Sequence, residues 1–429
     1  MKTLYLPYGR NNMPLNIPDD MNYSVYNSGL SEYRQPENSA ETVRLAMEHP
    51  IGTRPLHELA AGKNKVVIIA SDHTRPVPSR MIMPLMLQEI RAGNPDADIT
   101  ILIATGLHRS TSRKELVNKF GKEIVDNERI VIHDCDDSEN MTFLGTLPSG
   151  GRLVINRLAA EADLLVSEGF IEPHFFAGFS GGRKSVLPGI ASRETVMYNH
   201  NSSFIASKDA RTGVLENNLI HADMLFAARA ARLAFIVNVV IDAHHDPIFA
   251  VAGDCELAHK AGREFLLNHC CVYAEPADVV ITTNGGYPMD QNIYQSVKGM
   301  TAAEAAIKDG GIIIMASECS DGHGGKSFYE TFKAEDDNGI IMEKILSRSP
   351  ADTIPDQWQS QIFARVLMKA RIIFISSCPD ELVREMHMIP ARSFDEAFDI
   401  ARKMHGHENF SLNIIPDGVS VIVNPGRRV

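Results

Sequence analysis

One segment of the sequence, from Glu172 to His200, combines several residue types that can do chemistry. Its core, EPHFFAGFSGGRKSVLPGIA, contains a histidine, closely spaced glycines and an adjacent arginine and lysine. Glycine-rich turns expose backbone N–H groups, and beside cations such groups bind anions. The segment differs from a nucleotide-binding P-loop because Arg183 separates the glycines from Lys184. It therefore predicts an anion-binding turn, with a tight turn carrying a solvated lysine as the simpler alternative.

Histidines form a second group of candidates. The chain has 16, and an imidazole both titrates near neutral pH and ligates nickel, zinc or copper. A single loop histidine is most often a surface or capping residue, but several in neighbouring loops could supply acid–base partners, metal ligands or both. No HExxH motif occurs, so a zinc-dependent hydrolase would have to assemble its site from residues distant in sequence. The loop histidines are His73, His108, His174, His200 and His323.

Three further segments carry candidate binding residues. In SDHTRPVPSR, Arg75 precedes a proline and can project to hold a carboxylate or phosphate, although a structural pair with Asp72 is equally compatible. In NGGYPMDQNIYQSVKG, Tyr294 and Lys298 are four residues apart and share a face of an expected helix. A solvated amphipathic helix explains that spacing equally well. Trp358, the only tryptophan, is more often a core anchor than a site residue.

These segments follow short, β-branched apolar runs that alternate with longer helical patterns. The alternation predicts an α/β fold with mainly parallel sheets flanked by helices. Polar, glycine-containing loops follow five of the runs, at the strand ends where open α/β sheets bind ligands. The candidate strands are residues 65–70, 98–105, 129–134, 162–169, 234–242, 277–283, 311–317 and 371–377.

The length of 429 residues predicts more than one domain. We expect an N-terminal α/β domain over 1–275, a C-terminal α/β domain over 276–409, and a terminal hairpin over 410–429 that could pack back on the first domain. The first forty residues could form an extra strand pair or a dimer arm.

The composition excludes several classes of protein. A formal net charge of −12 argues against nucleic-acid and anionic-membrane partners. No apolar run is long enough for a transmembrane helix, the N-terminus lacks the pattern of a signal peptide, and the six cysteines form no CxxC motif. We therefore expect a cytoplasmic protein with small-molecule partners.

Taken together, the motifs resemble those of the nickel-pincer-dependent lactate racemase family. SDHTRPVP, TGLHR, EPHFFAGFSGGRKSVLPGIA, NGGYPMDQNIYQSVKGMTAAEA, DGHGG and IPDQW occur in matching order over essentially the whole chain. The resemblance implies two domains with the active site in the cleft between them. It also implies a nickel-pincer nucleotide, a pyridinium mononucleotide whose nickel is held by one carbon and two sulfurs.

The resemblance assigns a role to each candidate residue. His108 and His174 would be the catalytic acid–base pair, Lys184 the covalent attachment point of the cofactor, and His200 the nickel ligand. Arg75 would hold substrate and cofactor. Other cofactor-binding positions would be Asp72, Thr74, Ser180, Gly181, Gly182 and Tyr294, and other substrate-binding positions Gln295, Lys298 and Trp358.

The implied function is interconversion of D- and L-lactate by proton-coupled hydride transfer, through pyruvate. Alternatives are a racemase or epimerase of another 2-hydroxy acid (malate, phenyllactate or an aldonate), a zinc-dependent hydrolase, and a cofactor carrier without turnover. Cofactor-synthesis proteins would be needed for maturation, and the protein would be a monomer or homodimer.

Overall fold

A computed structural model describes the chain except residues 1, 20, 35–36, 243, 407–409 and 427–429. Contacts within the chain divide it into two compact units. The first consists of Leu30–His200 and Ser207–Asn268, and the second of Met1–Gly29, Asn201–Ala206 and His269–Val429. Within the described residues, no helix is long and apolar enough to cross a membrane.

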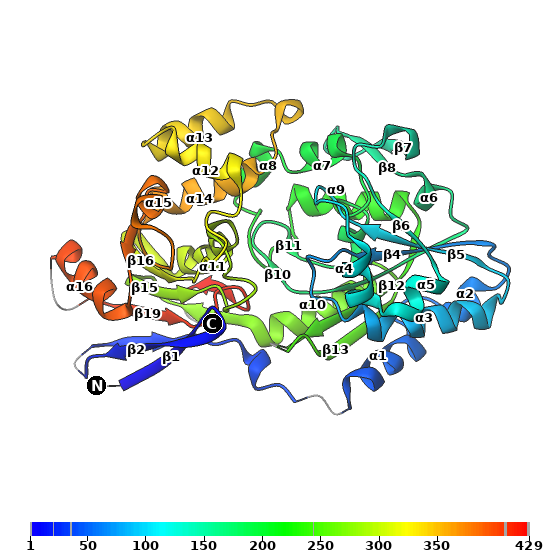
Figure 1. The fold of residues 1–429 in the computed structure, drawn as a ribbon, viewed down its shortest axis with the longest axis horizontal. Coiled ribbons are helices and arrows are strands. Elements are labelled where there is room, and N and C mark those ends of the chain that lie inside the picture. The colour runs from blue at the N-terminus through cyan, green and yellow to red at the C-terminus, as the bar shows by residue number, and fades with distance from the viewer. Residues whose placement is uncertain (1, 20, 35–36, 243, 407–409, 427–429) are drawn as a thin grey trace. The chain divides into compact units, whose positions relative to one another are not determined.

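The Leu30–Asn268 unit is built on a six-stranded sheet in the order β13-β12-β9-β4-β5-β6 (Figure 1). Every neighbouring pair is parallel except β12 and β13. The central strands are continuous apolar runs buried on both faces, as expected for a sheet covered by helices. The strands are β4 (Lys65–Ser71), β5 (Asp98–Ala104), β6 (Arg129–Ile132), β9 (Leu164–Phe170), β12 (Leu233–Ile241) and β13 (Pro247–Gly253).

Helices and short strands connect the strands of this sheet. The helix α4 begins with a capping box in which Ser112 and Glu115 satisfy each other's backbone N–H groups. The helices are α1 (Ser39–Glu48), α2 (Leu56–Ala60), α3 (Ser79–Gly93), α4 (Arg113–Phe120), α5 (Lys122–Asn127), α6 (Arg157–Ala160), α7 (Arg193–Asn199), α9 (Leu219–Ala230) and α10 (Leu257–Cys270). The short strand pairs are β7 (Met141–Thr146) with β8 (Arg152–Asn156), and β10 (Pro173–His174) with β11 (Gly178–Phe179).

The other unit contains a second six-stranded sheet, fully parallel, in the order β18-β17-β16-β15-β19-β3. Its strands are β3 (Tyr23–Val25), β15 (Ala277–Thr283), β16 (Ile307–Ala316), β17 (Arg371–Ile375), β18 (Ile389–Ala391) and β19 (Leu412–Ile415). The longer helices are α11 (Ile293–Ala306), α12 (Lys326–Lys333), α13 (Asn338–Leu346), α14 (Gln357–Lys369) and α16 (Phe394–His405); α8 (Ser202–Ala206) and α15 (Asp380–Glu385) are shorter.

All eight predicted strands are present, and the mainly parallel α/β architecture is confirmed. The N-terminal strand pair is also present, as β1 (Lys2–Tyr8) and β2 (Asn11–Ile17). Its Leu6, Leu15 and Ile17 side chains join the core of the second unit, so these residues belong with the C-terminal sheet and not with a domain over 1–275.

The predicted terminal hairpin is wrong. β19 pairs in parallel with β15 and β3, whereas β20 (Ile422–Pro425) pairs in parallel with β14 (Cys271–Ala274). The turn signal at residues 416–418 does not produce a hairpin, because β19 and β20 pair with strands of different sheets. The end of the chain therefore belongs to the second unit.

Candidate active site

Three neighbouring parallel strands of the first sheet deliver the candidate catalytic loops. β9, β4 and β5 lie side by side, and the loop after each begins where its strand ends. His174 follows β9, Asp72 follows β4 and His108 follows β5. Carboxyl ends of adjacent parallel strands meet at one edge of a sheet, which is where α/β proteins bind ligands.

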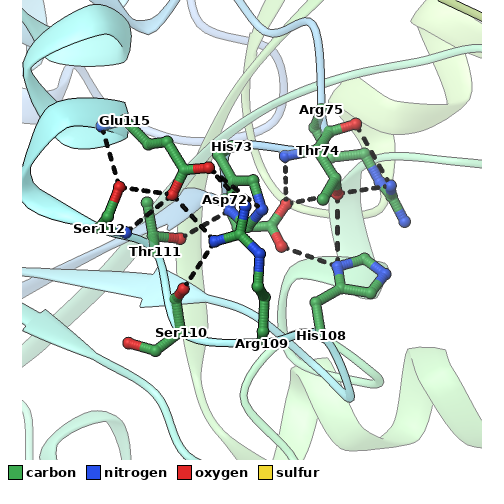
Figure 2. A network of polar contacts seen from close by, with 10 residues as sticks. All are labelled: Asp72, His73, Thr74, Arg75, His108, Arg109, Ser110, Thr111, Ser112 and Glu115. Atoms are coloured by element: carbon green, nitrogen blue, oxygen red, sulfur yellow. Dashed lines mark hydrogen bonds and ion pairs between the residues drawn. The ribbon is translucent and has the colours of Figure 1, made fainter.

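Asp72 and His108 form a hydrogen-bonded dyad across two of these loops (Figure 2). His108 Nδ1 lies 2.7 Å from Asp72 Oδ2. The Asp72 side chain is 1% exposed and that of His108 is 41% exposed. Asp72 also accepts hydrogen bonds from the backbone N–H and the hydroxyl of Thr74. The titratable imidazole of His108 is thus accessible to solvent, whereas its partner, the Asp72 carboxylate, is buried.

Asp72 is ionised at any pH at which the protein would work. Burial by itself would raise its pKa, but the hydrogen bond and charge of His108, with the charge of Arg75 and the hydroxyl of Thr74, outweigh that effect and lower the pKa to about 2. A carboxylate acceptor assigns the proton of neutral His108 to Nδ1 and leaves the lone pair on Nε2. His108 is therefore oriented as a general base.

A polar network holds the two loops together (Figure 2). His73 Nδ1 lies 3.0 Å from Thr111 Oγ1, and Arg109 forms an ion pair with Glu115 at 2.5 Å. His73 is thus a structural residue of this network. Arg75 donates to Thr74 Oγ1 at 2.8 Å, so its guanidinium is placed by Thr74, and the alternative of a direct Asp72–Arg75 ion pair is not what forms among the described residues.

Three of the predicted site residues lie around the ring of Phe176. It packs edge-on against His174 with ring centroids 4.5 Å apart and edge-on against His200 at 5.2 Å. Lys184 Nζ lies 5.8 Å from the centre of the same ring. Residues 26 positions apart in the sequence thus lie around one buried aromatic side chain, which the sequence analysis did not single out.

His174 and His108 differ in tautomer. The backbone N–H of Ala177 donates to His174 Nδ1 at 3.3 Å, which favours the neutral form with its proton on Nε2. In His108 the hydrogen bond to Asp72 favours the opposite form. One imidazole therefore presents a lone pair at Nε2 and the other an N–H group.

His200 has the properties of a metal ligand. It is the C-cap of α7 and 5% exposed. Burial, with the nearby charge of Lys184, lowers its pKa to about 3, so the imidazole is neutral, the form that binds a metal. Lys184 is only partly buried and offers a primary amine beside it. This donor set fits a cofactor attached through an amine and completed by one imidazole.

In the glycine-rich turn, for which the sequence predicts exposed N–H groups, three of these groups donate to protein acceptors. The N–H groups of Ser180, Gly182 and Lys184 donate to Glu172 O, Asn238 Oδ1 and Gly181 O, respectively. Gly181 has φ +76°, and a Cβ there would lie 2.7 Å from Asn238 Oδ1. The glycines are thus required by backbone conformation and close packing, and the Ser180 hydroxyl braces its own loop through Phe170 O and Glu172 N.

The remaining predicted site residues lie in the second unit. Tyr294, Gln295 and Lys298 fall in the first two turns of α11, so the predicted helix is present. Tyr294 donates its hydroxyl hydrogen to Asp356 Oδ1 at 2.9 Å. Trp358 is partly exposed in the first turn of α14, which argues against a purely structural core role. His323 stacks on Tyr329 at 4.8 Å and is structural.

A buried cationic cluster behind the turn was missed by sequence reasoning. Arg183 is 1% exposed. Its Nε donates to His221 Nδ1 at 3.1 Å, and its Nη1 lies 3.1 Å from His259 Nε2. Burial and the charges of Arg183 and Arg263 lower the pKa of His221 to about 3 and that of His259 well below its usual value. An arginine between a glycine and a lysine in a polar loop gives no sequence signal of such burial.

The neutral imidazoles of His221 and His259 predict loss of stability in acid. Unfolded histidines titrate near 6.5, whereas in the folded state the pKa of His221 is lowered to about 3 and that of His259 lies well below 6.5. Between those values the unfolded chain binds more protons, so the free energy of unfolding falls as the pH drops, by roughly 3 kcal/mol per pH unit for the pair. Urea unfolding of the apoprotein at pH 7.5, 6 and 5 measures this slope. His259→Asn should reduce it by about half, whereas an unchanged slope would show that His259 is not a buried neutral group.

A preformed zinc site is not found among the loop histidines. Within the described residues, the one group of His, Cys, Asp or Glu close enough to hold an ion is Asp134, Cys135 and Asp136. It contains no histidine, and Asp136 is engaged with Arg193 at 2.6 Å. The structure therefore gives no support to the zinc-dependent hydrolase alternative.

Comparisons with known proteins bear on this arrangement. The chain matches the family model of the lactate racemase N-terminal domain over residues 8–213 and that of the lactate racemase C-terminal domain over residues 272–423. The chain belongs to the lactate racemase family. The resemblance stated from the motifs is confirmed, and the chain is an enzyme of the isomerase class.

Individual members of the lactate racemase family are similar over their full length. The chain is 54% identical over 424 residues to a lactate racemase of Thermoanaerobacterium thermosaccharolyticum, covering 99% of both chains. It is 50% identical over 424 residues to one of Lactiplantibacillus plantarum, covering 99% of this chain and 100% of the relative.

Solved structures show the same fold. The lactate racemase apoprotein of T. thermosaccharolyticum superposes with a TM-score of 0.95 at 54% identity, covering 98% of this chain and 100% of that one. A structural-genomics protein of Thermotoga maritima gives a TM-score of 0.64 at 19% identity over 91% of this chain and 100% of that one. The latter shows only that the two-unit fold is shared.

Proposed function

We propose that this member of the lactate racemase family interconverts D- and L-lactate with a nickel-pincer nucleotide attached to Lys184. The observation that carries the proposal is the grouping of His174, Lys184 and His200 around Phe176. His174 follows β9, which neighbours β4, the strand that leads to Asp72 of the Asp72–His108 dyad. The full-length identity to two lactate racemases supports lactate as the substrate.

The reaction needs a way to exchange the hydrogen on Cα of lactate. That hydrogen is poorly acidic because the neighbouring carboxylate is already negative. Loss of a hydride from Cα, together with loss of a proton from the hydroxyl, gives pyruvate with an uncharged ketone group. This route avoids a doubly charged carbanion. The bound cofactor supplies the acceptor and donor of the hydride, and the proton is handled by the protein.

The two histidines suit proton transfer on opposite sides of a planar keto acid. His108 accepts the hydroxyl proton at Nε2, and the imidazolium that results is stabilised by the buried Asp72 carboxylate. On the other side His174, as the imidazolium, would donate a proton to the carbonyl oxygen as the hydride returns to the opposite face of pyruvate. Exchange of protons with solvent then restores both imidazoles for the next turnover.

The other residues hold and enclose the reactants in this proposal. Arg75, placed by Thr74, pairs with the substrate carboxylate, because a guanidinium binds a carboxylate through two parallel hydrogen bonds. Gln295, Lys298 and Trp358 would bind the substrate, and Tyr294 the cofactor. Retention of pyruvate between half-reactions requires exclusion of water from the site.

His200 would be the protein ligand of the nickel, and Lys184 the attachment point. Ser180, Gly181 and Gly182 would contribute by shaping the turn beside the nucleotide, since their described hydrogen bonds are internal to the protein. Maturation would require cofactor-synthesis proteins. The proposal also includes a cytoplasmic location and a monomeric or homodimeric state.

A racemisation panel tests the substrate assignment. Protein co-expressed with cofactor-synthesis proteins is supplied with the single enantiomers of lactate, malate and phenyllactate and with an aldonate, and product is followed by chiral chromatography. We expect kcat/KM for lactate to exceed that for the larger acids by at least about tenfold, because a pocket that fits a methyl group clashes with larger groups. A preference for a larger acid would move the assignment to that acid.

The same preparation separates the remaining alternatives. Intact mass and metal analysis should show a covalent adduct and nickel. Zinc without nickel or adduct would favour the hydrolase, and a stoichiometric adduct inert towards every acid would favour a carrier.

A further inference from the structure

Arg183 is a fully buried cation, and no acidic side chain among the described residues pairs with it. Burial and the charge of Arg263 lower its pKa to about 9, and no carboxylate opposes them. Its neighbour in sequence, Lys184, is the proposed attachment point of the cofactor. Burial of an uncompensated charge is expensive, so the position demands a reason that the proposed reaction does not supply.

The guanidinium of Arg183 donates hydrogen bonds to backbone carbonyls of the turn that precedes Lys184. Nη2 donates to Ala177 O at 2.8 Å, and Nη1 donates to Gly181 O at 3.2 Å and Ser180 O at 3.4 Å. These carbonyls lie on both sides of the glycine-rich bend. The planar group therefore spans the bend and ties its two arms together.

The two neighbouring histidines keep the guanidinium directed at these carbonyls. His221 on α9 accepts from Arg183 Nε at 3.1 Å. His259 on α10 lies 2.8 Å from Ser180 O, to which its Nε2–H can donate. Neutral imidazoles anchor the turn to two helices without competing for the guanidinium, whereas a carboxylate in either place would draw Arg183 away from the carbonyls.

We propose that Arg183 is a positioning residue that fixes the turn of residues 177–185 and thereby holds the Lys184 amine beside Phe176 and His200. The inference rests on the proposed role of Lys184 but has a test of its own. The proposed role depends on the planar guanidinium, whose N–H groups bind several carbonyls at once. A lysine at position 183 keeps the charge but cannot reach three carbonyls in this geometry.

The first experiment measures the reactivity of Lys184 in apoprotein, where no cofactor is required. Wild type, Arg183→Lys and Arg183→Gln are acetylated with an N-hydroxysuccinimide ester, and the modification rates of Lys184 and of exposed Lys208 are compared by peptide mass spectrometry. Release of the turn should raise the Lys184/Lys208 rate ratio about tenfold in both variants, because local opening exposes a partly buried amine. General loosening of the protein would also raise the rate of Lys119, a partly buried lysine of the same unit, relative to Lys208, whereas release of the turn alone leaves the Lys119/Lys208 ratio unchanged.

The matched control is Arg229→Lys, an exposed arginine on α9 paired with Glu256, which should leave the ratio at the wild-type value. If Arg183→Lys behaves as wild type while Arg183→Gln does not, charge alone suffices and the proposal is overturned. A wild-type ratio in both variants overturns it as well. If neither variant folds, judged by circular dichroism, His221→Asn keeps Arg183 and removes one anchor; it should raise the ratio severalfold, and no change there counts against the proposal.

The second experiment links the turn to cofactor attachment. Protein co-expressed with cofactor-synthesis proteins is analysed by intact mass, and we expect the adduct-bearing fraction of the Arg183 variants to fall about tenfold below that of wild type. Full loading of both variants would contradict the inference. Absence of adduct on wild type would instead refute the proposed function, and the acetylation result would still decide the role of Arg183.

Discussion

Lys184→Ala protein should carry no covalent adduct and should lose racemase activity by at least about 10⁴-fold. The amine is the one nucleophile that the structure places with both His174 and His200 around Phe176 within the described part of the chain. Without the amine, the cofactor of the proposed function could associate only reversibly and would not be held beside His200. Intact mass of protein matured in the same host measures the adduct, and D- to L-lactate conversion measures activity.

Lys208→Ala is the matched control, because Lys208 is exposed in the same unit and its removal should change neither readout. Lys184→Arg retains a cation but not a nucleophilic amine, so it should resemble Lys184→Ala. An adduct on Lys184→Ala protein that still supports racemisation would show that another residue attaches the cofactor.

Asp72→Asn should lower kcat by roughly 10² to 10⁴-fold while the fold is kept. The carboxylate fixes the proton of His108 on Nδ1 and stabilises the imidazolium formed when Nε2 takes the substrate proton. An amide loses the charge, and its NH₂ group favours the opposite tautomer. Initial rates from D- and L-lactate between pH 5 and 9 measure the effect.

The pH dependence adds a check on this assignment. Because the pKa of Asp72 is lowered to about 2, any loss of wild-type activity between pH 7 and 5 must come from another group. Asp96→Asn, at an exposed position of the same unit, should behave as wild type. Since the two enantiomers of lactate have equal free energies, kcat/KM must fall equally in both directions. Near-normal kcat in Asp72→Asn would remove Asp72 from the proton-transfer apparatus.

Much of the fold was predictable because its signals are local. The eight apolar runs became strands because a buried parallel strand needs continuous β-branched side chains. The loops that follow β4, β5 and β9 were correctly expected at the carboxyl ends of neighbouring parallel strands, which is the edge where open α/β sheets bind ligands. The motif resemblance found the family because it relied on residue identity and order, which require no knowledge of distances.

The errors arose where pairing is decided far away in the sequence. A Pro-Asp-Gly turn between two apolar runs is a valid local hairpin signal, yet β19 finds its partners in β15 and β3 and β20 finds its partner in β14. The strand pair at the N-terminus joined the C-terminal core for the same reason, because Leu6, Leu15 and Ile17 are buried there. Local patterns determine that a segment is a strand, but buried area elsewhere determines its neighbour.

The sequence by itself determined which residue types stand at the strand ends, and so which chemistry is available. Only the tertiary structure decided how they act. It paired His108 with Asp72, gave three N–H groups of the glycine-rich turn protein acceptors and placed Phe176 among three of the predicted site residues. It also buried Arg183 with no counter-charge among the described residues. Hydrogen-bond geometry and desolvation depend on residues from many elements at once, and no spacing along the chain encodes them.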